Sequence, residues 1–197
     1  MPPVELHSIA VYCGSSPGAD PAFTAAASKL GRHLGQQRIR LVYGGGHVGL
    51  MGVVADAALQ VGGEVIGVIT EALAEREVAH DHLGRLEVVA TMHERKATMA
   101  DLSDAVIMLP GGFGTLDEFF EAVTWTQLGI HATPCGILDV AGYFAPLLHF
   151  LDNAVDAGFI DPRHRAMITT ASDPGALVDA LGLIEGRTEG VLSDRDR

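Results

Sequence analysis

Short apolar runs alternate with segments of helical spacing along most of the chain, and this alternation constrains the fold more than any other feature. The apolar runs are rich in Val, Ile and Leu, which is typical of strands buried on both faces of a parallel sheet. The sequence therefore predicts an α/β fold with a doubly wound parallel sheet and helices on both faces. The predicted strands are Ser8–Cys13, Arg40–Tyr43, Glu64–Ile69, Leu86–Thr91, Ala105–Leu109 and Cys135–Leu138, and the predicted helices are Pro21–Gln36, Gly49–Val61, Met92–Ser103, Gly114–Leu128, Tyr143–Ala157 and Pro174–Leu183.

Small residues follow three of these strands, at the points where the strands end. They are Gly14-Ser15-Ser16, Gly44-Gly45-Gly46 and Gly111-Gly112. In open parallel sheets, ligands bind beyond the carboxyl ends of the strands. We therefore expect one edge of the sheet to carry the functional site. The triple glycine could serve only to allow a tight turn, but its cost in backbone entropy favours contact with a ligand.

The segment Pro110–Glu118 joins a strand end to a helix start through a glycine-rich turn. Backbone N–H groups in such a turn lie at the positive end of the helix dipole, where a phosphate binds well. Glu118 places a carboxylate one helical turn further on. Two interpretations of Glu118 stay open: an acid that acts on a bound nucleotide, or the second member of a capping box that begins at Thr115. Glu121 shares the helix face of Glu118, either as a catalytic partner or as a solvated acid.

Two cations, Arg95 and Lys96, follow Met92 at the start of a predicted helix. A helix N-terminus favours acids, so this pair has no local electrostatic reason to be there. A solvated basic pair is the alternative, but we favour a bound anion, which an arginine can grip in two places.

Composition excludes several classes of protein. The net charge of −12 over 197 residues disfavours a nucleic-acid surface. No apolar stretch is long enough to cross a membrane, no secretory signal is visible, and Cys13 and Cys135 are predicted to be buried thiols, so we expect a cytoplasmic location. We see no P-loop pattern and no metal-ligand spacing. A single domain is expected over residues 1–184, followed by a polar, disordered tail at 185–197.

Three weaker interpretations concern side chains outside these motifs. Asp56 is expected to make a buried packing contact, and the polar cluster at 80–82 to form a solvated turn. Trp125 shares an apolar helix face with Phe119, Phe120 and Leu128. That face is expected to belong to the core, with a subunit interface as the alternative.

Taken together, the motifs resemble those of the LOG ("Lonely guy") family of cytokinin riboside 5′-monophosphate phosphoribohydrolases. The segment Pro110–Glu118 is similar to the family's P-G-G-x-G-T-x-x-E motif, with Asp117 where many relatives carry Glu. The resemblance extends to Tyr12-Cys13-Gly14-Ser15-Ser16, Tyr43-Gly44-Gly45-Gly46, Gly49-Leu50-Met51-Gly52, Met92-His93-Glu94-Arg95-Lys96 and residues 124–131, and so covers nearly the whole chain.

This resemblance implies a Rossmann-like domain that forms homodimers and hydrolyses the N-glycosidic bond of N6-substituted adenosine 5′-monophosphates without a cofactor or a metal. It implies Arg95 and Glu118 as the catalytic residues. The expected substrate-binding residues are Gly14, Ser15, Gly45, Gly46, Met92, Lys96, Gly111, Gly112, Gly114, Thr115 and Glu121. The alternative is a protein of the same fold that binds or carries a nucleotide or phosphorylated cofactor without hydrolysing it.

The family's older label, possible lysine decarboxylase, fits this sequence poorly. Pyridoxal chemistry needs a Schiff-base lysine with a partner for the pyridinium nitrogen. The chain has only Lys29 and Lys96, and neither lies in such a setting.

Overall fold

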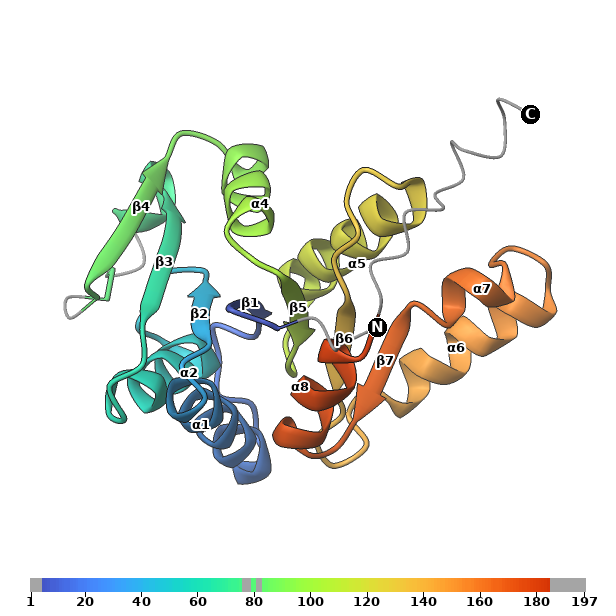
Figure 1. The fold of residues 1–197 in the computed structure, drawn as a ribbon, viewed down its shortest axis with the longest axis horizontal. Helices are drawn as coiled ribbons and strands as arrows, with labels where there is room; N and C mark the ends of the chain where they lie inside the picture. The colour runs from blue at the N-terminus through green and yellow to red at the C-terminus, as the bar shows by residue number, and fades with distance from the viewer. Residues whose placement is uncertain (1–4, 76–78, 81–82, 185–197) are drawn as a thin grey trace.

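The computed structural model describes residues 5–75, 79–80 and 83–184 and contains a sheet of seven strands (Figure 1). The order across the sheet is β4-β3-β2-β1-β5-β6-β7, and each neighbouring pair is parallel. The predicted α/β fold is therefore confirmed. The predicted tail at 185–197 lies outside the described residues. The strands are β1 (Ser8–Tyr12), β2 (Arg40–Tyr43), β3 (Val65–Thr70), β4 (Arg85–Val89), β5 (Ala105–Met108), β6 (Cys135–Leu138) and β7 (Ile168–Ala171).

The helices also follow the sequence pattern, with some additions. Each predicted helix is present, and α3 and α7 are short helices that the sequence did not predict. Strand β7 was also missed, because only Ile168 of its four residues is a large buried side chain. The helices are α1 (Pro21–Gln36), α2 (Gly49–Leu59), α3 (Glu71–Ala74), α4 (Met92–Asp101), α5 (Phe113–Leu128), α6 (Ala145–Asp156), α7 (Pro162–Arg165) and α8 (Pro174–Gly182).

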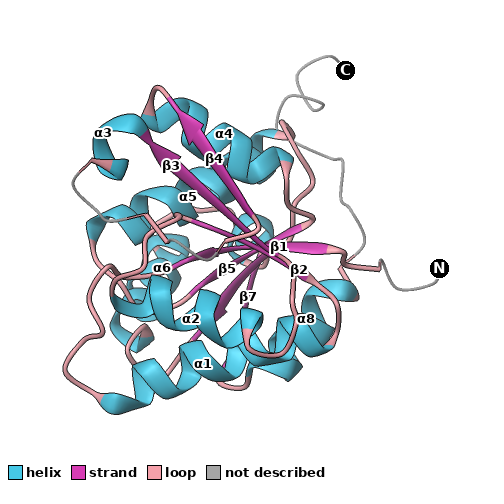
Figure 2. Cartoon of the chain, turned by 90° about the vertical axis from the view of Figure 1, so that its left-hand side faces the viewer, coloured by secondary structure: helices cyan, strands magenta, loops and turns pink. Residues whose placement is uncertain are grey.

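Helices cover both faces of the sheet. Ile9 and Val11 of β1 pack with side chains of α1, α2 and α8, whereas Ala10 and Tyr12 pack with those of α4, α5 and α6. Successive strand residues point to opposite faces, so the continuous apolar strands feed two separate cores. Figure 2 shows α1, α2 and α8 together on one side of the sheet.

Close packing of α1 on α2 depends on small residues. A Cβ on Gly31 would lie only 2.2 Å from the Val54 carbonyl oxygen, so a side chain at this position would push the helices apart. The start of α1 is capped by Asp20, whose carboxylate accepts a hydrogen bond of 2.8 Å from the Ala22 N–H. Within the described residues, no helix has the length and apolar character that a membrane crossing requires.

The strand order reverses between β1 and β5, which makes their carboxyl ends the topological switch point of the sheet. The two loops that leave these strands are joined to each other. The Gly14 N–H donates to the Pro110 carbonyl at 3.0 Å, and the Gly14 carbonyl accepts from the Leu50 N–H at 3.0 Å. Glycine-bearing turns that are far apart in sequence are thereby brought together at one edge.

Candidate active site

A cavity of about 260 Å³ lies at this switch point, between the β1 loop and the start of α5. It brings together many of the site residues predicted from the sequence. Those that line it are Gly14, Ser15, Arg95, Gly112, Gly114, Thr115 and Glu118. Sequence reasoning missed Cys13, Met51, Leu73 and Phe113, which also line it. Met51 follows the glycine turn after β2, and Cys13 follows β1, so their positions beside strand ends were the available signal.

Arg95 and Glu118 form a buried ion pair in the wall of this cavity. Nη1 of Arg95 donates to Oε1 of Glu118 at 3.0 Å, and the two side chains are only 7% and 10% exposed. The guanidinium also donates to backbone, from Nε to the Val68 carbonyl at 3.0 Å and from Nη2 to the Gly44 carbonyl at 3.2 Å. Arg95 therefore joins α4 to the ends of β2 and β3 while it orients Glu118 on α5.

The surroundings of Glu118 shift the pKa of its carboxyl group. Burial raises the pKa of this carboxyl above its ordinary value, even though the nearby charge of Arg95 lowers it. A carboxyl group that has lost much of its water gives up its proton less readily. Once ionised and held by arginine, the carboxylate is a strong electrostatic partner for a developing positive charge.

The capping role that the sequence left open for Glu118 is wrong. Helix α5 begins at Phe113 and has Gly112 as its N-cap, with no side-chain cap, so Thr115 lies inside the first turn. The carboxylate of Glu118 reaches Arg95 instead. A true capping box occurs at α4, where Thr91 and Glu94 bond to each other's backbone N–H groups.

The start of α5 has the form of an anion site. No side chain caps its first turn, whose residues line the cavity, so the backbone N–H groups there and the positive end of the helix dipole are available to an anion. Gly111 fits closely beneath it, because a Cβ there would lie 2.1 Å from Oγ1 of Thr115 and 2.8 Å from the Gly14 nitrogen. Gly114 is exposed, and a Cβ there would meet no atom within 4 Å.

Lys96 does not reach the cavity. Its ammonium lies 3.2 Å from Oδ2 of Asp117 and 2.7 Å from Oε2 of Glu121, so both carboxylates on α5 are engaged with it. Burial lowers the pKa of Lys96, but Glu121 and Asp117 outweigh this effect and the pKa is raised overall. The pair Arg95 and Lys96 thus meets carboxylates of α5, a reason for their presence that sequence analysis did not find.

The glycine turn after β2 also lies outside the cavity. Gly45 and Gly46 are buried beneath the segment 79–80, since the His80 N–H donates to the Gly45 carbonyl at 3.2 Å and Gly46 pairs with Ala79. The turn contributes indirectly, through the Gly44 carbonyl that receives Arg95.

Two other predicted positions differ from expectation. His80 is only 6% exposed and lies 3.0 Å from Oδ1 of Asp56, so it is not part of a solvated turn, while Asp56 itself is exposed rather than buried. Residues 81 and 82 of that predicted turn lie outside the described residues. Met92 is exposed, with its sulfur 3.7 Å from Nη1 of Arg95, and it does not line the cavity.

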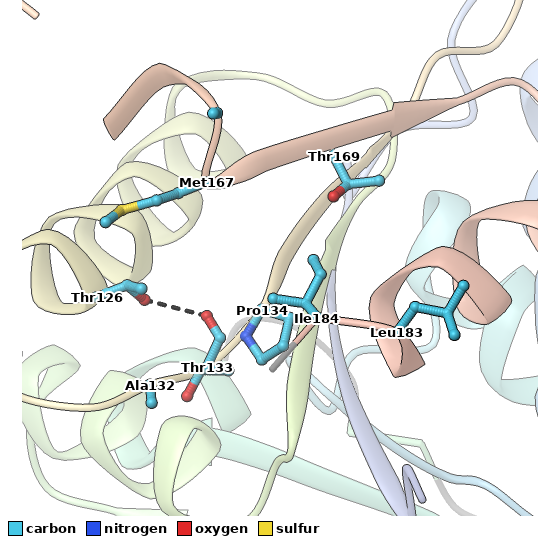
Figure 3. A pocket seen from close by; sticks show the side chains of 9 residues that line it. Thr126, Ala132, Thr133, Pro134, Met167, Thr169, Leu183 and Ile184 are labelled. Atoms are coloured by element: carbon cyan, nitrogen blue, oxygen red, sulfur yellow. Dashed lines mark hydrogen bonds between the residues drawn. The ribbon is translucent and has the colours of Figure 1, made fainter. Parts of the chain in front are cut away.

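A larger cavity, of about 530 Å³, lies where β6 and β7 begin (Figure 3). Thr126 lines this cavity, and its hydroxyl donates to the Thr133 carbonyl at 3.1 Å. No charged side chain is among the described residues that line it. In the described part of the chain, no three His, Cys, Asp or Glu side chains are grouped to hold a metal ion.

The chain is similar to known proteins over most of its length. A family described as possible lysine decarboxylase matches residues 51–181. The phosphoribohydrolase LOG7 of Arabidopsis thaliana, which acts by name on cytokinin riboside 5′-monophosphate, is 49% identical over 94% of this chain and 85% of its own length. LOG1 of Arabidopsis thaliana, of the same name, is 48% identical over 97% and 90%.

The chain belongs to the LOG family.

Solved structures of other proteins share the fold of this LOG protein. The molybdenum cofactor binding protein from Rippkaea orientalis has a TM-score of 0.67 at 22% identity, over 89% of this chain and 95% of its own. The molybdenum cofactor carrier protein from Chlamydomonas reinhardtii has a TM-score of 0.65 at 19% identity, over 89% and 96%. Such low identity shows a shared fold alone.

The lysines of this LOG protein do not suit the decarboxylase description. Lys96 is held between Asp117 and Glu121, and Lys29 is exposed on α1 and paired with Asp173. Neither ammonium lines the cavity at the switch point.

Proposed function

We propose that this protein hydrolyses the N-glycosidic bond of adenosine 5′-monophosphates, including N6-substituted ones, and releases the free base and ribose 5-phosphate. One observation carries the proposal: the Glu118–Arg95 pair and the uncapped start of α5 face the same cavity. The named activity of relatives at 48–49% identity supports the same reaction.

The phosphate is assigned to the first turn of α5. The N–H groups of the turn from Gly112 to Thr115 bind it, in a cavity that Gly14 and Ser15 also line. These contacts lie away from the bond that breaks, so their binding energy serves to position the ribose. A nucleoside without the phosphate should therefore react poorly.

Glu118 is the catalytic residue in this proposal. When the bond between C1′ and the base nitrogen breaks, the electron pair leaves with the base and positive charge develops on the ribose ring. The Glu118 carboxylate stabilises this charge and orients the water that attacks C1′. The hydroxyl group of that water becomes bonded to C1′, and its other proton is transferred to the departing base.

Arg95 acts through Glu118. The sequence suggested that it anchors the phosphate or the base, but its guanidinium donates to the Val68 and Gly44 carbonyls and to Glu118. Arginine does not deprotonate in proteins, so it is not a general acid. We assign it as a positioning residue that keeps the Glu118 carboxylate ionised and aimed into the cavity.

We also infer a homodimer and a cytoplasmic location. Phe113 is 93% exposed at the rim of the cavity and Ile130 is 61% exposed just beyond the end of α5, so apolar surface is available beside the site. Both cysteines are free and buried, which suits a reducing compartment. Sedimentation analysis tests the dimer, for which a single monomeric species would be the contrary result.

The reaction is tested by incubating the protein with AMP, N6-isopentenyl AMP and the two matching ribosides, and following both products by chromatography. We expect base and ribose 5-phosphate in equal amounts from the monophosphates, and much slower release from the ribosides. Tight binding of AMP without base release would indicate the carrier function instead. Equal turnover of riboside and monophosphate would refute the phosphate site.

A further inference from the structure

The turn that precedes α5 is held by one tyrosine. Tyr143 lies just before α6, and its hydroxyl donates to the Gly111 carbonyl at 2.7 Å. The two residues are 32 positions apart in sequence, and Tyr143 lines a different cavity from the one that Glu118 and Arg95 line.

Gly112, the last residue of this turn, is loosely packed, because a Cβ on it would meet no atom within 4 Å. Beside the turn lies a second cavity of about 370 Å³, whose walls include Phe23, Leu50 and Tyr143. Gly112 lines both this second cavity and the cavity at the switch point, as do Gly14 and Ser15. Hydrogen bonds, rather than packing around Gly112, therefore set the orientation of the peptide between Gly111 and Gly112.

The geometry of the peptide bond links this contact to the phosphate site. All described peptide bonds are trans, so the N–H of Gly112 points opposite to the carbonyl of Gly111. With that carbonyl bound to Tyr143, the Gly112 N–H is directed away from Tyr143.

Tyr143 is itself well fixed. Its ring meets Phe23 and Phe144 edge to face, with centroids 5.4 and 4.8 Å apart. The preceding residues Ala141 and Gly142 both have positive φ, of 52° and 71°, and the Tyr143 N–H donates to the Val140 carbonyl at 3.0 Å. A left-handed alanine is costly, which indicates that this turn is set to aim the tyrosine.

We propose that Tyr143 is a positioning residue for the substrate phosphate: by holding the Gly111 carbonyl, it presents the Gly112 N–H to the phosphate at the start of α5. This inference rests on the proposed function. It extends the site to a residue that touches neither the cavity at the switch point nor the reacting bond.

Tyr143→Phe tests the proposal, because it removes the hydroxyl and keeps the ring. We expect KM for AMP and the inhibition constant of inorganic phosphate to rise together, by about three- to tenfold for one lost hydrogen bond. The value of kcat should stay within about twofold, and kcat/KM for adenosine should not change. The matched control is Phe23→Leu, which alters the ring contact with Tyr143 in the same second cavity and should leave phosphate affinity unchanged.

Unchanged phosphate affinity in Tyr143→Phe would overturn the proposal. It would also be overturned if Phe23→Leu lost as much phosphate affinity as Tyr143→Phe, or if Tyr143→Phe lowered kcat/KM for adenosine as much as for AMP. Failure of the proposed function has a different signature, in which the wild type binds AMP but releases no base. In that case the dissociation constants of AMP and phosphate, measured by calorimetry on the same variants, decide the role of Tyr143. A wild type that binds neither would contradict both proposals.

Discussion

Nη1 of Arg95 lies 3.0 Å from Oε1 of Glu118, and neither side chain is more than one-tenth exposed. Arg95 starts from α4 and Glu118 from α5, so the pair joins two helices across the ends of the central strands. The same contact organises the cavity wall, and the charge of Arg95 favours the ionised form of Glu118, the carboxylate among the described residues that line the cavity.

Loss of Arg95 should cost both stability and activity. Arg95→Ala leaves the Val68 and Gly44 carbonyls and the Glu118 carboxylate without their donor, and breaking a buried pair from one side costs about 3–5 kcal/mol. Arg95→Lys should recover little, because one ammonium cannot reproduce the planar fork. Urea unfolding and base release measure the two effects. Wild-type stability in Arg95→Ala would contradict the positioning role.

The pH dependence of activity should reveal the raised pKa of Glu118. Since the carboxylate is the active form, kcat/KM should fall on the acid side with an apparent pKa above the ordinary 4.5. A pH–rate profile for AMP hydrolysis tests this. An acid limb at or below 4.5 would show that Arg95 outweighs burial.

The same shift predicts how stability depends on pH. A carboxyl whose pKa is raised in the folded state contributes stability below its unfolded pKa and loses it as pH rises through the folded value. The uncharged Glu118→Gln variant should therefore gain stability relative to the wild type as pH rises above about 4.5. Thermal unfolding from pH 4 to pH 8 measures how the stability difference between variant and wild type changes with pH, and a difference that moves against the variant as pH rises would be the contrary result.

Alanine substitutions at two glycines near the start of α5 should have opposite effects on stability. Gly111→Ala brings a Cβ to 2.1 Å from Oγ1 of Thr115, so we expect the free energy of unfolding to fall by about 1–3 kcal/mol. Gly114 lies in the first turn of the helix with open space around it, and Gly114→Ala should raise stability by about 0.5–1 kcal/mol. Denaturant unfolding of both variants decides this, and a stable Gly111→Ala protein would mean that the turn adapts.

Lys96 should matter for the α4–α5 contact more than for substrate. Lys96→Met breaks ion pairs with Asp117, which is 63% exposed, and Glu121, so we expect a cost of about 1 kcal/mol. Because Lys96 does not line the cavity, KM for AMP should change less than about threefold. A large rise in KM with normal stability would instead support the contact between Lys96 and the substrate that the sequence predicts.

Much of the fold was predictable because the strands are continuous apolar runs and the helices have clear starts. The pattern around Ala105–Leu109 and the following glycines located β5 and, to within one residue, the start of α5. Strand β7 was missed because, at the edge of the sheet, it needs only one buried side chain, Ile168.

The site was predictable in its residues and less so in their relations. The spacing of Thr115 and Glu118 matches a capping box, and local sequence alone does not show that Arg95, 23 residues earlier, takes the carboxylate. The role of the triple glycine was likewise hidden, since the segment that covers Gly45 and Gly46 comes from residues 79–80. Such contacts depend on which strands are neighbours in the sheet, and the order of the strands is not evident from local sequence patterns.

Glu118→Gln tests the central claim most directly. The amide keeps the size of the side chain and an acceptor for Arg95, so the protein should fold and bind AMP with a dissociation constant within a few-fold of the wild type. Release of ribose 5-phosphate should fall by about a hundredfold or more, as for a lost catalytic carboxylate. Glu64→Gln, which removes an exposed carboxylate paired with Arg40, is the control and should keep full activity. Near-normal base release by folded Glu118→Gln would contradict the account.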